Sequence, residues 1–137
     1  MIRVTIGLKG SGKTKKLIDG ANAAVGSEKG DVVCVTYSSR LIHDIDRGIR
    51  LINTEPFDIK NFDMFGGFIC GVISENYDIT HIFIDSIFKI IPGGSMEDLD
   101  GFMATLENLE KQFDVSFTIM VSAGLADATA NVKKYIA

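Results

Sequence analysis

The segment Gly7–Thr14 has the residue types and the spacing that a phosphate-binding loop requires. It satisfies the pattern G-x-x-x-x-G-K-[ST] in full. Glycines allow a tight turn whose backbone N–H groups point inward, and they leave room for an anion. A helix that begins where the loop ends would add its positive N-terminal end. The residues expected to surround the phosphates are Gly7, Leu8, Lys9, Gly10, Ser11, Gly12, Lys13 and Thr14.

Three side chains have more specific predicted roles. Lys13 is expected to reach the β- and γ-phosphates of a nucleoside triphosphate, where each hydrogen bond to a charged group contributes roughly 1.5–3 kcal/mol. The Thr14 hydroxyl is expected to ligate Mg²⁺, which bridges phosphate oxygens and keeps several waters. Such a site needs a carboxylate at the end of a neighbouring strand, and Asp85 follows the apolar run Ile82–Ile84. We therefore predict Lys13 and Asp85 as catalytic residues, and Thr14 and Asp85 as the metal site.

Strands and helices are predicted to alternate around these residues. Runs rich in β-branched residues predict strands over residues 2–6, 32–37, 81–85 and 115–121. Apolar residues at helical spacing predict helices over residues 14–25, 41–52, 65–73, 95–113 and 125–136. Ser95 and Asp98 form a predicted capping box at the start of one helix. This alternation predicts βαβ units with right-handed crossovers. The expected fold is a single α/β domain over residues 1–137, with three α/β/α layers and a mainly parallel sheet of four to five strands.

Composition limits the classes of partner. Hydrophobic residues make up 46% and charged residues 23% of the 137-residue chain, as is typical of a globular protein. A net charge of −4 gives no indication of binding to nucleic acid or to an anionic membrane. Arg40, Arg47 and Arg50 are interpreted as a solvated helix face, and Cys34 and Cys70 as buried small hydrophobes. No apolar stretch approaches the roughly 20 residues of a membrane span, so we expect a cytoplasmic protein.

The motifs resemble those of a known superfamily. Gly7–Thr14 resembles a Walker A motif and Ile82–Asp85 resembles a Walker B motif, so the chain is similar over nearly its whole length to P-loop NTPases. The order of its elements is similar to that of RecA-like ATPases. In that comparison Ser122, after Ile119–Val121, matches a polar sensor position, although a plain strand-end serine is the alternative. The segment Ser122–Leu125 also resembles part of the thymidine kinase core.

This resemblance implies binding of Mg²⁺ and a nucleoside triphosphate. ATP is the default, because the guanine-reading pattern N-K-x-D is absent. Many related ATPases have a Glu directly after the Walker B Asp, whereas this chain has Ser86, so hydrolysis is expected to be slow or stimulated by a partner. One alternative is a small-molecule or nucleoside kinase, with Asp44, Glu75 or an acid near residues 89–95 as the base. Another is a nucleotide-binding switch or structural subunit that does not hydrolyse its ligand.

The resemblance also bears on assembly. A RecA-like core normally has a further strand beside the phosphate-loop strand, and no such strand is predicted here. We therefore expect an open sheet edge that could pair with a second copy of the chain or with a partner protein.

Overall fold

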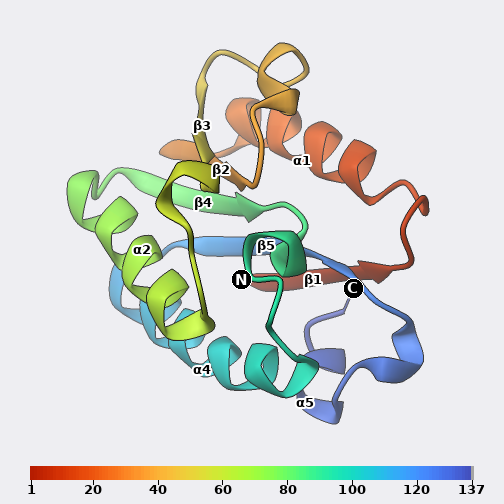
Figure 1. The fold of residues 1–137 in the computed structure, drawn as a ribbon. Helices are drawn as coiled ribbons and strands as arrows, with labels where there is room; N and C mark the ends of the chain where they lie inside the picture. The colour runs from red at the N-terminus through yellow and green to blue at the C-terminus, as the bar shows by residue number, and fades with distance from the viewer. Residues whose placement is uncertain (137) are drawn as a thin grey trace.

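Runs of β-branched and aromatic residues form five strands, which pair into one parallel sheet (Figure 1). The computed structural model describes residues 1–136. The sheet has the order β1-β5-β4-β2-β3, and every neighbouring pair is parallel. The predicted α/β class is thus confirmed, with a sheet that is wholly rather than mainly parallel. The strands are β1 (Ile2–Gly7), β2 (Asp31–Thr36), β3 (Ile49–Asn53), β4 (Ile79–Ile84) and β5 (Ser116–Ser122).

Over residues 1–136, five α-helices and three short 3₁₀ turns connect or follow the strands. The capping box of α4 is formed as predicted, because the Ser95 hydroxyl accepts from Asp98 N at 3.1 Å and the Asp98 carboxylate accepts from Ser95 N at 3.1 Å. The helices are α1 (Lys13–Ser27), α2 (Phe62–Glu75), α3 (Ile87–Ile90), α4 (Met96–Phe113) and α5 (Ala130–Lys133). The 3₁₀ turns are Arg40–His43, Glu55–Phe57 and Leu125–Asp127.

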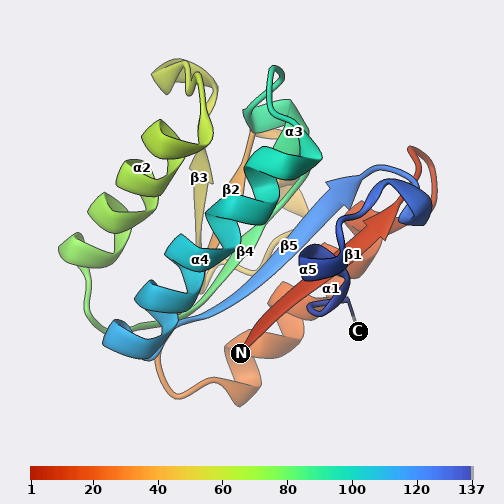
Figure 2. The ribbon, with the colours of Figure 1, turned by 90° about the horizontal axis from the view of Figure 1, so that it is seen from below.

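The helices form a layer on each face of the sheet. Leu17 and Ala21 of α1 pack with Leu41 and Ile45 in one apolar cluster, so the chain after β1 and after β2 runs over the same face. The helices α2, α4 and α5 supply the larger cluster on the opposite face (Figure 2). The chain therefore leaves β1 and β2 toward one face, and leaves β4 and β5 toward the other.

The helix predicted over residues 41–52 is wrong. Residues 40–43 form a 3₁₀ turn, and residues 49–53 form β3, whose Ile52 pairs with Val35 of β2. Leu41, Ile45 and Ile49 do pack together against α1, so the apolar spacing reflects burial without a helix. Such short runs do not distinguish a helix from a strand, and here pairing with β2 decides the outcome. The closing helix predicted over residues 125–136 is also wrong, because only the 3₁₀ turn and the short α5 form there.

The edge of the sheet at β1 is partly covered by the same chain. Val4 N donates to the carbonyl of Tyr135 at 2.8 Å, and Val4 forms an isolated parallel bridge with Ile136. The Tyr135 hydroxyl also donates to Glu107 of α4, which holds this segment in place. Pairing of the remaining β1 edge with another chain stays a prediction.

The two cysteines differ in their surroundings. Cys34 is buried in β2 as predicted, and burial together with the charge of Asp85 raises the pKa of its thiol to about 12. The prediction for Cys70 is wrong, because Cys70 is exposed on α2. Its neighbour Ile69 faces the core, and the next residue of a helix turns about 100° away. Over residues 1–136, no helix is both long enough and apolar enough to cross a bilayer.

Candidate functional site

The connection between β1 and α1 is a glycine-rich turn. The residues Gly10 and Gly12 have φ values of 85° and 88°, in the left-handed region that favours glycine. A Cβ atom added at either position would meet nothing within 4 Å. Glycine is therefore needed here for the backbone conformation and not for lack of space. Because Gly12 is the N-cap of α1, the turn delivers the chain directly into that helix.

Lys13 is the first residue of α1, and its side chain lies back over the turn. Its Nζ donates to the carbonyl of Leu8 at 2.9 Å and to the Ser11 hydroxyl at 3.3 Å, and only 8% of the residue is exposed. Thr14 follows on the helix and is half-buried. One buried ammonium group is thus held at the positive end of a 15-residue helix.

Asp85 lies directly after β4 and is only 5% exposed. The Ser86 hydroxyl donates to its Oδ1 at 3.2 Å. Burial raises the pKa of the Asp85 carboxyl, while the Ser86 hydrogen bond and the charges of Lys89, Arg40 and Lys13 act in the opposite direction. Its Oδ2 accepts no hydrogen bond from the part of the chain that the structure describes, so the carboxylate keeps capacity for a metal-bound water.

Ser86 has a positive φ of 50°, an uncommon conformation for a residue other than glycine. The carbonyl of Ser86 accepts from Lys89 N at 2.8 Å, which closes the single turn of α3. This sharp change of direction brings Phe88 and Lys89 of α3 to the same end of the sheet as the glycine-rich turn. Uncommon backbone conformations of this kind gather at ligand sites.

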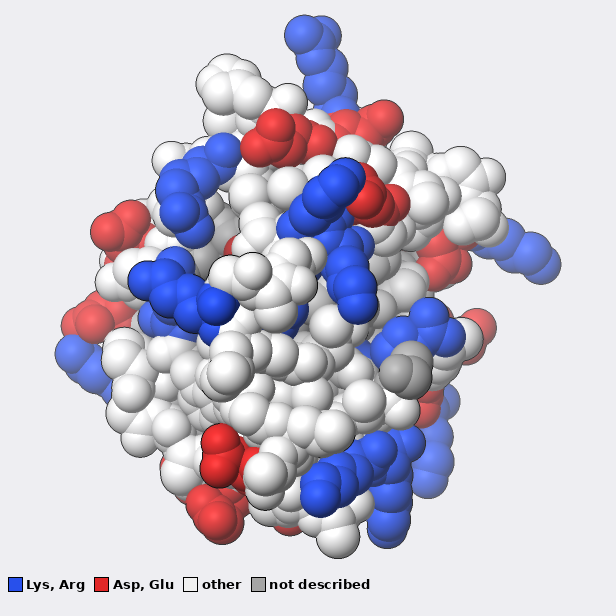
Figure 3. Space-filling view, turned by 90° about the vertical axis from the view of Figure 1, so that its right-hand side faces the viewer, with Lys and Arg blue, Asp and Glu red and all other residues white. Residues whose placement is uncertain are grey.

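These segments enclose a cavity of about 540 Å³ at the carboxyl ends of the strands, which we call the loop cavity. Its lining includes four cations and no carboxylate. The lining residues are Lys9, Gly10, Gly12, Lys13, Thr14, Arg40, Ser86, Phe88, Lys89 and Ser122. Figure 3 views the side of the molecule on which the glycine-rich turn lies, and Lys and Arg side chains gather around its pale central area.

A smaller cavity of about 80 Å³, which we call the side cavity, adjoins the loop cavity. The residues Arg40, Ser86 and Lys89 line both cavities. The side cavity is completed by Tyr37, Ser38 and Asp85. The two cavities therefore share one wall, which is built from the segment after β2 and from α3.

The structure brings most of the predicted site residues together. Lys13, Thr14 and Ser122 line the loop cavity, where Ser122 of β5 is the register partner of Gly7. Asp85 lines the adjoining side cavity. Over residues 1–136, no group of three or more His, Cys, Asp and Glu side chains could hold a metal ion. A divalent ion would therefore depend on Thr14, Asp85 and the oxygens of a bound phosphate, which suits a hard cation.

Sequence reasoning missed Arg40 and Lys89. The sequence pattern places Arg40 on a solvated helix face, whereas Arg40 lines both cavities. The only available signal was its position four residues after the end of β2. Arg50, by contrast, forms an ion pair with Glu75 at 3.2 Å, at the end of α2. Neither Glu75 nor Asp44 lines the loop cavity or the side cavity.

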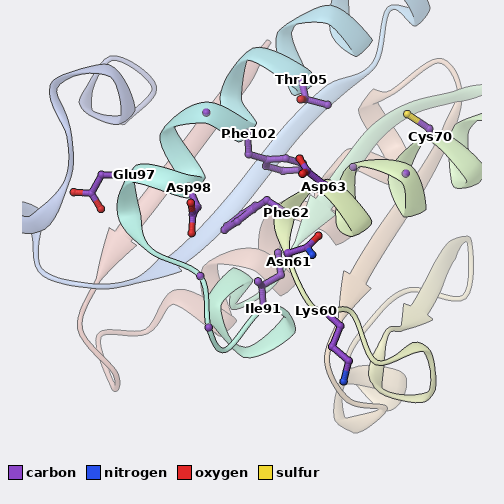
Figure 4. Close-up of a pocket in the computed structure, with 15 residues that line it drawn as sticks. Lys60, Asn61, Phe62, Asp63, Cys70, Ile91, Glu97, Asp98, Phe102 and Thr105 are labelled. Carbon is purple, nitrogen blue, oxygen red and sulfur yellow. The ribbon is translucent and has the colours of Figure 1, made fainter.

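A larger cavity lies elsewhere, between α2 and α4 (Figure 4). This groove of about 640 Å³ has Phe62 and Phe102 in its middle, with ring centroids 5.2 Å apart. Three carboxylates and one cation line it, namely Asp63, Glu97, Asp98 and Lys60. Its charge is therefore the opposite of that of the loop cavity.

No family model matches this chain, and a search of curated proteins finds no match either.

Proposed function

We propose that this protein binds a nucleoside triphosphate, with ATP as the first choice, together with Mg²⁺ in the loop cavity. The proposal depends on one observation, namely that two phosphate-binding features line the same cavity. One is a turn with two left-handed glycines that opens α1, and the other is a wall of four cations without a carboxylate. Backbone N–H groups, a helix N-terminus and cations are the groups that bind phosphate.

Each residue has a role in this proposal. Lys13 exchanges its contact with the Leu8 carbonyl for the β- and γ-phosphates. Thr14 and Asp85 hold the Mg²⁺, which neutralises charge on the phosphates when it is bound. Ser122 contacts the terminal phosphate from β5. The assignment to P-loop NTPases of the RecA-like branch belongs to this proposal and rests on the loop, Asp85 and the parallel sheet.

The expected reaction is slow hydrolysis. Asp85 is the one carboxylate among the lining residues of the loop and side cavities, and the proposal commits it to the metal. Ser86 occupies the position after it, and a hydroxyl is a poor general base at neutral pH. A partner that supplies the missing group would raise the rate.

A second candidate is transfer of the γ-phosphoryl group to an acceptor. The side cavity favours this candidate, because it places Arg40 and Lys89 between the loop cavity and a separate small space. A pure hydrolase needs room for a water only, which takes roughly 10–15 Å³.

A thermal-shift panel of ATP, GTP, ADP and GDP, with and without Mg²⁺, tests the proposal. A ligand at 100 times its Kd adds about 2.7 kcal/mol to the stability of the folded state. We expect a Mg²⁺-dependent rise in Tm with triphosphates for the wild type and for Lys60→Ala, and no rise for Lys13→Ala. No shift with any nucleotide in the wild type, or an equal shift in Lys13→Ala, would contradict the proposal.

A further inference from the structure

We infer that Arg40 and Lys89 form a second anion site in the side cavity, which takes the phosphate group of a second substrate. This inference rests on the proposed function in one respect only: the nucleotide in the loop cavity is taken as the first substrate, and the phosphate group in the side cavity belongs to a second one. The anion site itself is a property of the side cavity.

The topology supplies a further ligand crevice besides the one that carries the phosphate loop. In parallel α/β sheets, ligands bind at the carboxyl ends of strands where neighbouring connections leave toward opposite faces. The chain leaves β1 and β5 toward opposite faces, and the crevice between them carries the glycine-rich turn and Ser122. It also leaves β2 and β4 toward opposite faces, and the side cavity is lined by Ser38 after β2 and by Asp85 after β4. The phosphate loop accounts for the first crevice only.

Arg40 is held in an orientation that suits anion binding. Its backbone N and its side-chain Nε both donate to the Ser38 hydroxyl, each at 3.3 Å. The Thr36 hydroxyl in turn donates to the carbonyl of Ser38, so the segment after β2 is fixed to the sheet. Contact through Nε leaves the two Nη groups of the guanidinium to bind an oxyanion in a forked arrangement.

The cations at the shared wall outnumber the carboxylates of the side cavity, because Asp85 is the one carboxylate in its lining and its charge interacts with both Arg40 and Lys89. Within residues 1–136, neither Arg40 nor Lys89 has a carboxylate within 4.0 Å, although four other cationic groups besides His81 form ion pairs. Two cations beside the hydroxyls of Tyr37 and Ser38 match a phosphate group, which carries nearly two charges and offers three acceptor oxygens. At about 80 Å³ the side cavity admits such a group but no nucleoside.

The test uses the wild-type protein saturated with Mg²⁺ and a non-hydrolysable ATP analogue, so that the phosphate loop is occupied. Inorganic phosphate is then titrated by calorimetry, with acetate as the comparison titrant. We expect one phosphate to bind to the loaded protein. Arg40→Ala and Lys89→Ala should each weaken the affinity for this phosphate by about tenfold, as for one charge-assisted hydrogen bond. Arg47→Ala, which changes an exposed arginine outside both cavities, is the matched control.

Two results would overturn the inference. Phosphate could fail to bind the loaded protein, or it could bind equally well to Arg40→Ala and to the wild type. If Arg40→Ala in the second case also loses the preference for ATP over ADP, Arg40 contacts the γ-phosphate instead.

A further arm separates this inference from the proposed function. Lys13→Ala without nucleotide should still bind phosphate in an Arg40-dependent way. If the wild type binds no nucleotide but retains this phosphate site, the proposed function fails and the anion site stands. If nucleotide binds and the Arg40-dependent phosphate site is absent, the anion site fails and the proposed function stands.

Discussion

The loop cavity and the α2–α4 groove are similar in size and opposite in charge. The groove, at about 640 Å³, is the larger, and it carries three carboxylates and one cation. The loop cavity, at about 540 Å³, carries four cations and no carboxylate. Size alone would place a ligand in the groove. A triphosphate carries several negative charges, so the electrostatics favour the smaller cavity.

The two cavities also differ in what their glycines do. Gly10 and Gly12 at the loop cavity have left-handed backbone conformations that other residues adopt only at a cost. The groove is lined by Gly66, Gly67 and Gly101 within helices and by Gly93 and Gly94 between α3 and α4, and none of these five has a positive φ. Glycine at the loop cavity shapes the backbone around a ligand, whereas glycine in the groove leaves out a side chain. This difference can be tested residue by residue.

The largest expected effect comes from removing a lysine in each cavity. Lys13→Ala should weaken binding of Mg²⁺ and ATP by about a hundredfold or more, because two hydrogen bonds to charged groups are worth roughly 1.5–3 kcal/mol each. Lys60→Ala removes the single cation of the groove and should leave the affinity unchanged. Calorimetric titration of both variants measures the contrast. An equal loss of ATP affinity in Lys13→Ala and Lys60→Ala would contradict the assignment of the nucleotide to the loop cavity.

The next largest effect comes from changing two carboxylates, Asp85 in the side cavity beside the loop cavity and Asp63 in the groove. Asp85→Asn should weaken the Mg²⁺-dependent part of nucleotide binding by about 10–100-fold, as expected for a group that holds the metal's waters. Without ligand the same variant should be more stable at neutral pH, because burial raises the pKa of Asp85 and its ionised form therefore disfavours folding. Asp63→Asn in the groove is the control. Titration of Mg²⁺ at fixed ATP and a melting curve check both parts, and a loss of stability in Asp85→Asn would contradict the second.

Alanine in place of a glycine should act in opposite directions at the two sites. Gly12→Ala should destabilise the protein by roughly 1–2 kcal/mol, since its φ of 88° is unfavourable for a residue with a Cβ. Gly67→Ala should stabilise it by up to about 1 kcal/mol, because Gly67 lies in α2 with nothing within 4 Å of an added Cβ. Urea unfolding at 25 °C measures both changes. Destabilisation in both variants would show that the groove glycines are also constrained by the backbone.

The smallest effect is a pH dependence that arises outside both cavities. His81 Nδ1 lies 2.8 Å from Glu28, and His81 Nε2 lies 2.8 Å from the Thr118 hydroxyl. Burial lowers the pKa of His81, partly opposed by Glu28, so the unfolded chain takes up this proton at a higher pH. The contribution of His81 to stability is therefore complete above about pH 6.5 and falls as the pH drops below that value.

His81→Gln keeps a hydrogen-bond donor and an acceptor in the side chain and cannot titrate, so it is the matched variant. The difference in Tm between wild type and His81→Gln should change between pH 7.5 and pH 5.5, with the wild type losing more on acidification. Nucleotide affinity should not follow this change. A constant difference in Tm across this range would contradict the assigned pKa direction.

The sequence predicted those parts of the site that are encoded locally. The glycine-rich turn and Asp85 could be recognised because a strand, a loop and a helix follow one another within a few residues. Arg40 could not, because its place in the cavities depends on the pairing of β2 with β4, which are more than 40 residues apart. The same reason explains the wrong helix prediction over β3. The apolar spacing within residues 41–52 does not show that residues 49–53 pair with β2.

The most direct test of the central claim is an NMR titration of ¹⁵N-labelled protein with Mg²⁺ and ATP. The glycine amides serve as reporters in both cavities, because Gly10 and Gly12 line one and Gly67 and Gly101 line the other. We predict saturable shifts of the Gly10 and Gly12 signals, with Gly67 and Gly101 unchanged. Shifts confined to Gly67 and Gly101, or no shifts at all, would contradict the account.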